Sequence, residues 1–104
     1  MLFSAVVTDR DGVATVSLVG ECDLATVPRF RQAVVGATRD RSSLVVDLSA
    51  LEFIDSVGLG VLIGARRRVG TLAVVCPPGR VRDLLAVTQL DQILDVRASA
   101  DDLD

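Results

Sequence analysis

Residues 46–62 read VDLSALEFIDSVGLGVL, and the pattern of apolar residues changes within this stretch. The run Leu44–Leu48, which overlaps its start, is short and apolar except for Asp47, and it is interpreted as a strand buried on both faces. Farther along, apolar side chains recur at helical spacing and predict a helix over Val57–Arg68. The pair Asp55-Ser56 falls where that helix begins. We therefore expect a buried strand, a loop and a helix, in that order.

The segments on either side continue this alternation of strands and helices. The first two strands are predicted to form an antiparallel hairpin around Asp9–Gly12, where glycine readily adopts a positive φ. The full order favours a small α/β fold with a mixed, mostly parallel sheet of about five strands, the first strand antiparallel, and three or four helices. Residues 1–104 are expected to form a single domain. The other expected strands are Leu2–Thr8, Val13–Val19, Leu72–Cys76 and Ile93–Val96, the other helices are Val27–Ala37 and Val81–Thr88, and residues 98–104 fray or form a short terminal helix.

The composition narrows the range of functions. Half of the 104 residues are apolar, which is enough for a buried core. Because the chain has no histidine, Ser-His-Asp and Cys-His catalysis and histidine-ligated zinc are excluded. All 11 basic residues are arginines, so lysine Schiff bases and a Walker-type phosphate lysine are excluded as well. We expect the chain not to be an enzyme and to carry no catalytic residue, metal site or cofactor.

Charge and hydropathy argue against two classes of partner. The net charge is −3, and an acidic chain without a concentrated basic face is a poor nucleic-acid binder. The longest apolar run, Val57–Ala65, is far shorter than the ~20 residues that cross a bilayer. The N-terminus has no basic leader, so we expect a cytoplasmic protein with no membrane partner. Cys22 and Cys76 form no CxxC motif and are expected to be free, inert thiols.

Asp55 and Ser56 form the most distinctive candidate site. Ser56 is well placed as the N-cap of the helix. Gly58 and Gly60 follow in the first turn, where each glycine costs about 1 kcal/mol relative to alanine. We expect these glycines to let another backbone or a partner protein approach closely, and part of the apolar helix surface to face that partner. A phosphate on Ser56 would add about −1.5 to −2 charges beside Asp55, so a switch is physically reasonable.

Three other polar groups have structural explanations. Thr26 is expected to cap the first helix. Asp47 is expected to hydrogen-bond loop backbone. Arg66–Arg68 lie in the last turn of the second helix, where positive charge suits the helix dipole, and the alternative is a partner-binding patch.

Four motifs in order resemble one protein family. Phe53–Leu62 resembles the signature of STAS domains, specifically that of stand-alone bacterial anti-sigma factor antagonists. Gly20–Thr26 is similar to the first loop of that family, with its Gly-Glu-x-Asp pattern. Val46–Ser49 fits as well, and so does Val74–Pro78 with the helix that follows it. The resemblance covers essentially the whole chain and implies the βα-superhelix fold of the family.

The resemblance also implies a function. In this family the unphosphorylated protein binds an anti-sigma factor that is also a serine kinase of the histidine-kinase-like ATPase type, and binding frees the sigma factor. The kinase then phosphorylates the serine after the aspartate, here Ser56, and a metal-dependent serine phosphatase resets the protein. A monomer or weak dimer is expected. The implied partner-binding residues are Asp23, Asp55, Ser56, Val57, Gly58, Leu59 and Gly60.

The sequence departs from the family pattern at three places. Val57 stands where a second serine or threonine is common, which leaves Ser56 as the only candidate hydroxyl in the motif. The stretch between Leu62 and Leu72 is about one helical turn shorter than usual. Gln89 replaces a glycine that usually follows the third helix.

Two other functions fit the same fold. One is a constitutive interaction subunit of a lipid-transport ATPase or a stress-sensing assembly, in which Ser56 is never modified. The other is a sensor that binds a nucleotide or a lipid at the loop ends of the parallel strands, where α/β sheets place ligands.

Overall fold

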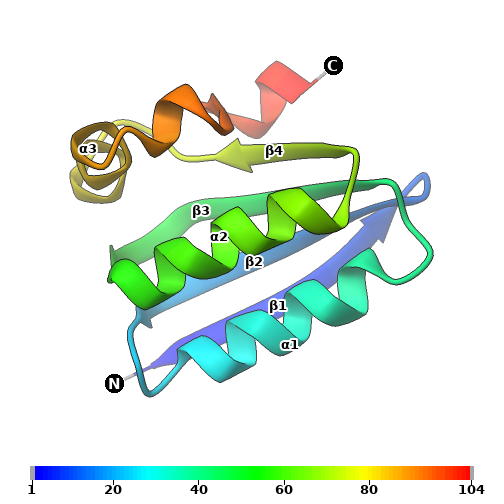
Figure 1. The fold of residues 1–104 in the computed structure, drawn as a ribbon, viewed down its shortest axis with the longest axis horizontal. Coiled ribbons are helices and arrows are strands. Elements are labelled where there is room, and N and C mark those ends of the chain that lie inside the picture. Colours follow the sequence, from blue (N-terminus) through cyan, green and yellow to red (C-terminus); the bar gives the residue numbers. More distant parts are fainter. Residues whose placement is uncertain (1, 104) are drawn as a thin grey trace.

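The computed structural model describes residues 2–103, and its strands and helices follow the predicted order (Figure 1). Two short 3-10 helices, η1 and η2, are added near the C-terminal end, and η2 lies in the predicted acidic tail. The elements are β1 (Phe3–Arg10), β2 (Val13–Cys22), α1 (Val27–Thr38), β3 (Ser43–Ile54), α2 (Ser56–Arg68), β4 (Thr71–Val75), α3 (Arg80–Val87), η1 (Leu90–Gln92), β5 (Asp95–Arg97) and η2 (Ala100–Leu103).

The five strands form one mixed sheet in the order β1-β2-β3-β4-β5. β1 is antiparallel to β2 and every other pairing is parallel, which confirms the predicted α/β sheet with an antiparallel strand at one side. α1 and α2 lie side by side over one face of the sheet (Figure 1). The site described below is carried by the ends of β2 and β3 and by the start of α2.

The hairpin of β1 and β2 is longer than predicted and closes at a tight turn. Its pairs run from Phe3 with Gly20 to Arg10 with Val13. The two turn residues, Asp11 and Gly12, have φ angles of 54° and 83°. Positive φ at both central positions matches the twist of the flanking strands, so the expected role of Gly12 is confirmed.

β3 differs from its prediction in two ways. It continues to Ile54, whereas the sequence indicated a loop after Leu48. The reason is pairing with β2, which follows β3 to its end through two register shifts. Its side chains alternate between half-buried and buried over residues 43–48, and four of the six that follow are exposed, so β3 is not buried on both faces as predicted. Consecutive buried residues occur instead in β4, over Leu72–Val75.

The shortened segment after α2 leads directly into β4. α2 ends at Arg68, and Val69 has the extended backbone of a strand. The N–H groups of Gly70 and Thr71 both donate to the carbonyl oxygen of Ser42, each at 3.0 Å. After α3, Gln89 has a φ of 62°, the left-handed conformation that favours glycine. The glycine that the resemblance implies at this position would adopt this backbone without strain.

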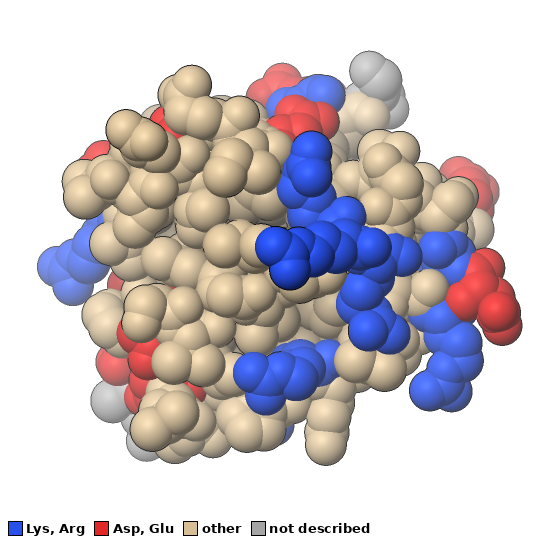
Figure 2. Space-filling view, in the orientation of Figure 1, with Lys and Arg blue, Asp and Glu red and all other residues tan. Residues whose placement is uncertain are grey.

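The charges are not evenly spread over the surface. Figure 2 shows arginine side chains gathered on one face of the molecule. Arg31 on α1 and Arg66–Arg68 at the end of α2 belong to the two helices that cover this side. The expectation of a chain without a concentrated basic face is therefore wrong, because arginines far apart in sequence meet in space. No helix within residues 2–103 is long and apolar enough to span a membrane.

Candidate functional site

The start of α2 is capped by Asp55 and not by Ser56. One carboxylate oxygen, Oδ1 of Asp55, accepts the N–H groups of Val57 and Gly58, each at 3.1 Å. Asp55 has the extended backbone of an N-cap, and Ser56 is the first helical residue. The predicted cap is therefore wrong by one residue, because β3 runs up to Ile54 and leaves only Asp55 between strand and helix. As a result the exposed Ser56 hydroxyl has no capping role.

The loop after β2 is held together by Asp23 and Thr26. Asp23 Oδ1 accepts the N–H groups of Ala25 and Thr26, at 3.0 and 3.2 Å. In return, Thr26 Oγ1 accepts the Asp23 N–H at 2.9 Å and donates to the Glu21 carbonyl oxygen at 2.9 Å. The Thr26 side chain does not cap α1 as predicted, because its hydroxyl is used within this loop. Asp23 therefore has a fixed position.

The two loops meet at one end of the sheet. The Asp55 N–H donates to the carbonyl oxygen of Cys22 at 3.1 Å, which joins the end of β3 to the end of β2. The Cys22 thiol is buried below this junction. Burial first, and then the carboxylates of Asp55 and Asp23, raise the pKa of Cys22 to about 11. The thiol stays protonated at neutral pH, which agrees with the predicted inert cysteine.

The second cysteine behaves in the same way. Cys76 is free and buried, and burial is the main cause that raises its pKa, while Arg82 lowers it in part. The prediction of two free thiols is confirmed. Asp47 hydrogen-bonds nearby backbone as expected, since its Oδ1 accepts the N–H and the hydroxyl of Ser49 at 2.9 and 2.6 Å, but Ser49 lies in β3 and not in a loop.

Gly58 and Gly60, grouped together by the sequence, have different surroundings. A Cβ atom added to Gly58 would lie 2.6 Å from Cγ1 of Ile54 and 3.0 Å from Sγ of Cys22. Gly58 is thus required by packing inside the protein, and the expected approach of a partner does not explain it. A Cβ on Gly60 would meet no atom within 4 Å. Leu59 is in the core at 6% exposure, so only Gly60 and Val57 of this turn lie at the surface beside Ser56.

Three large apolar side chains are exposed around the two loops. Leu24 follows Asp23 and is 73% exposed, Phe53 near the end of β3 is 40% exposed, and Val57 is 37% exposed. The sequence singled out Val57 but gave no role to Leu24 or Phe53, although both lie within the quoted motifs. We call Asp23, Leu24, Phe53, Asp55, Ser56 and Val57 the Ser56 surface.

A hollow of about 390 Å³ lies at the carboxyl ends of β3 and β4. Ser49 and Glu52 line it from β3, and the segment Pro77–Arg80 lines it from the other side. The sensor hypothesis predicts its ligand in this region, at the loop ends of the parallel strands. Residues 2–103 contain no group of three side chains that could hold a metal ion.

Comparisons with known proteins agree with this fold. The family model described as STAS domain matches residues 4–103. The Mycobacterium tuberculosis protein named anti-sigma-F factor antagonist RsfB is 42% identical over 65 residues, which are 62% of this chain and 53% of that protein. The match thus spans about half the length of that relative. An anti-sigma-B factor antagonist of Listeria monocytogenes is 31% identical over 85 residues, 77% of this chain and 75% of the relative.

A solved structure extends the likeness to three dimensions. The crystal structure of an anti-sigma factor antagonist from Mycobacterium paratuberculosis matches with a TM-score of 0.91 and 35% identity, over 97% of this chain and 90% of the other. The family match, the two named relatives and this structure all point to the same family. The chain therefore belongs to the STAS domain family.

Proposed function

We propose that this chain is an anti-sigma factor antagonist. Its unphosphorylated form binds an anti-sigma factor that is also a serine kinase of the histidine-kinase-like ATPase type, and this binding releases a sigma factor in the cytoplasm. The observation that carries the proposal is the Ser56 surface: an exposed hydroxyl on the first helical residue, next to a capping carboxylate and bordered by exposed apolar side chains. The printed names of the relatives support the same function.

Phosphorylation of Ser56 switches binding off by adding charge to a surface that otherwise forms a dry contact. The carboxylates of Asp55 and Asp23 already accept backbone N–H groups nearby, and the N–H groups of Val57 and Gly58 are used by Asp55. A phosphate with about −1.5 to −2 charges therefore finds few donors in this chain and adds to negative charge already there. A metal-dependent serine phosphatase restores the free hydroxyl. The chain acts as a ligand and a substrate, and not as a catalyst.

The experiment measures binding of the anti-sigma factor encoded by the same genome, together with the intact mass of the chain after incubation with ATP. Ser56→Asp should lose binding while the fold is kept, and Ser56→Ala should bind without gaining a phosphate. Ser42→Asp is the matched control, because Ser42 is exposed just before β3, at the opposite end of that strand from Ser56. Equal binding by Ser56→Asp and the wild type would exclude the electrostatic switch.

The alternative of a constitutive interaction subunit predicts no modification at all. The chain recovered from its own cells, in growth and under stress, would then carry no phosphate in its intact-mass profile. A single phosphate that varies with condition and is absent from Ser56→Ala would support the switch instead.

The hollow at the ends of β3 and β4 favours a sensor as the second candidate. Its volume of about 390 Å³ falls within the ~300–1,000 Å³ range of small-molecule sites, and Arg80 and Glu52 supply charged groups. Nucleotides and fatty acids at millimolar concentration should then raise the melting temperature of the purified chain. The unchanged melting temperature expected for a pure interaction module would argue against the sensor.

A further inference from the structure

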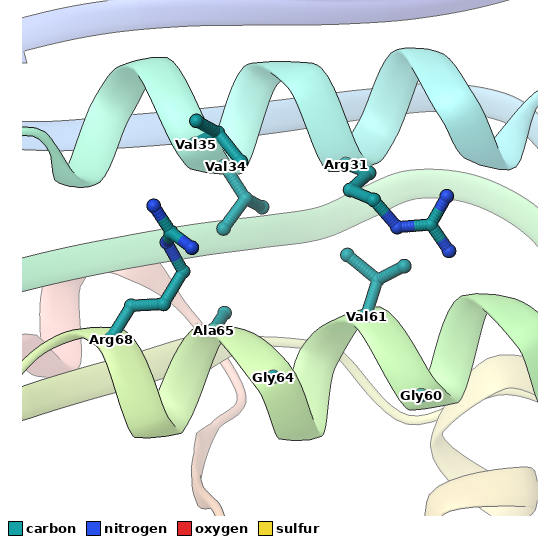
Figure 3. Close-up of a pocket in the computed structure, with 8 residues that line it drawn as sticks. All are labelled: Arg31, Val34, Val35, Gly60, Val61, Gly64, Ala65 and Arg68. Carbon is teal, nitrogen blue, oxygen red and sulfur yellow. The ribbon is translucent and has the colours of Figure 1, made fainter.

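A groove of about 260 Å³ lies between α1 and α2, on the face where the arginines gather (Figures 2 and 3). Its floor is apolar and formed by core side chains: Val34 of α1 and Val61 and Ala65 of α2 are 2%, 7% and 1% exposed. Gly60 and Gly64 of α2 also line it, and a Cβ added to either would meet no atom within 4 Å. Because glycine has no side chain, α2 leaves open space at these two positions, and nothing in residues 2–103 fills it.

Arginine side chains stand at the two ends of this groove. Figure 3 shows Arg31, from α1, near Val61 and Gly60, and Arg68, from α2, near the other end. The Nε of Arg68 donates to Oγ1 of Thr38 at 3.0 Å, and Thr38 is only 6% exposed, so this guanidinium is held in place from the α1 side. The two ion pairs within residues 2–103 are formed by Arg41 and Arg97. Among these residues, no carboxylate therefore lies within 4.0 Å of the guanidinium of Arg31 or Arg68.

The groove begins at Gly60, one helical turn after Ser56 along α2. Ser56, Gly60, Gly64 and Arg68 are spaced four residues apart along α2, and side chains at this spacing lie on the same side of a helix. A partner that covers Ser56 therefore meets the groove one helical turn farther along, without crossing any other element.

We propose that the groove between α1 and α2 binds an acidic amphipathic helix of the anti-sigma factor. The proposal rests on the proposed function, and it assigns that partner a second contact beyond Ser56. The glycines let the backbone of a third helix approach closely, the apolar lining takes its apolar side chains, and Arg31 and Arg68 pair with carboxylates flanking them.

The geometry favours a helix over other anionic partners. A nucleic-acid backbone would use the arginines but leave the apolar lining without a role. The volume of about 260 Å³ is below the ~300–1,000 Å³ of typical small-molecule and lipid pockets, whereas a groove between two helices has the shape that a third helix fills.

The test measures the dissociation constant of the same anti-sigma factor with two groove variants and two matched controls. Gly64→Leu fills the groove, and Arg31→Glu reverses the charge at one end. Gly36→Leu is the control for the first, because Gly36 is an α1 glycine with open space around it that does not line the groove. Arg10→Glu is the control for the second, at an exposed position in the hairpin. Each groove variant should weaken binding about tenfold or more, and each control less than twofold.

A photo-crosslinker at Gly64 identifies what occupies the groove. It should label a helical segment of the anti-sigma factor that is rich in Asp and Glu, and a crosslinker at Gly36 should not label that segment. Labelling of a basic segment or of none overturns the proposal. A competition experiment gives a second way to overturn the proposal. It would be overturned if vesicles of anionic lipid or a short RNA duplex displaced the partner from the wild type but not from Arg31→Glu.

The outcomes keep this inference apart from the proposed function. If Ser56→Asp loses binding while Gly64→Leu and Arg31→Glu bind as the wild type does, the function stands and the groove contact is wrong. If Ser56→Asp binds normally while both groove variants bind weakly, the groove contact stands and the phosphorylation switch is wrong.

Discussion

At the start of α2 the carboxylate of Asp55 is bound to two backbone N–H groups, whereas at the end of the same helix three arginines extend from the surface. Both arrangements suit the helix dipole, which favours negative charge at the N-terminus and positive charge at the C-terminus. Only the first end, however, is tightly built: Gly58, Ile54 and Cys22 leave no spare volume beneath it. The helix thus has one end fixed by internal packing and one end whose last turn carries three basic side chains at the surface.

The largest expected effect separates the glycines of these two regions. Gly58→Leu should lower the free energy of unfolding by about 3 kcal/mol, since the new side chain overlaps Ile54 and Cys22. Gly64→Leu should raise it by about 0.5–1 kcal/mol, because leucine favours a helix and space is open there. Urea denaturation of both variants measures the difference. Equal stabilities would show that Gly58 is no more tightly packed than Gly64.

A second test concerns the cap itself. Asp55→Ala should cost about 1–2 kcal/mol, because the N–H groups of Val57 and Gly58 lose their acceptor. Ser56→Ala should change stability by less than about 0.5 kcal/mol, because Ser56 is not the cap. Thermal unfolding of the two variants side by side decides which residue caps α2, and a larger loss for Ser56→Ala would contradict the structure.

The pH dependence of stability reports on the buried thiol below the cap. The folded-state pKa of Cys22 is raised to about 11 from 9.0, so the unfolded chain loses this proton first as pH rises. Stability should therefore fall between pH 9 and 11, by no more than about 1 kcal/mol over the first pH unit. The chain has no Tyr and no Lys, so Cys76, whose pKa burial also raises, is the other side chain that contributes to this fall. Cys22→Ala should show a shallower fall, and an identical slope would show that Cys22 is not the cause.

The smallest expected effect lies at the open end of the helix. Arg68→Gln should lose about 0.5 kcal/mol more than Arg66→Gln, because only Arg68 donates to the buried Thr38 hydroxyl. Both variants remove one charge from the last turn, so the effect on the helix dipole is matched. Chemical denaturation at fixed salt measures the difference, and no difference would mean that this hydrogen bond does not stabilise the folded chain.

The order of elements could be predicted because apolar periodicity is a local property of the sequence. The turn at Gly12 and the spacing of Leu59 and Leu62 needed no knowledge of distant residues. The extension of β3 could not be found in this way, since residues 49–54 form a strand only by pairing with β2. The burial of β3 on one face depends likewise on what covers the sheet.

The sequence predicted the central pair of the candidate site, Asp55 and Ser56, but not the contacts that surround this pair. Asp55 and Ser56 were identified together, but which of them caps α2 depended on where β3 ends. The sequence showed that Gly58 is costly, but not that Ile54 and Cys22 require it. The arginine face was missed because Arg31 is distant in sequence from Arg66–Arg68 and joins them only when α1 packs beside α2.

The two outer strands of the sheet differ in length, and this has a consequence for solubility. β5 spans three residues, whereas β1 spans eight and carries Val6 and Val7 at 51% and 46% exposure. A long strand at a sheet edge can add a strand of another molecule, and a very short one cannot. Self-association of concentrated protein should therefore begin along β1, and a lysine in place of Val6 is the first change to make for a more soluble sample.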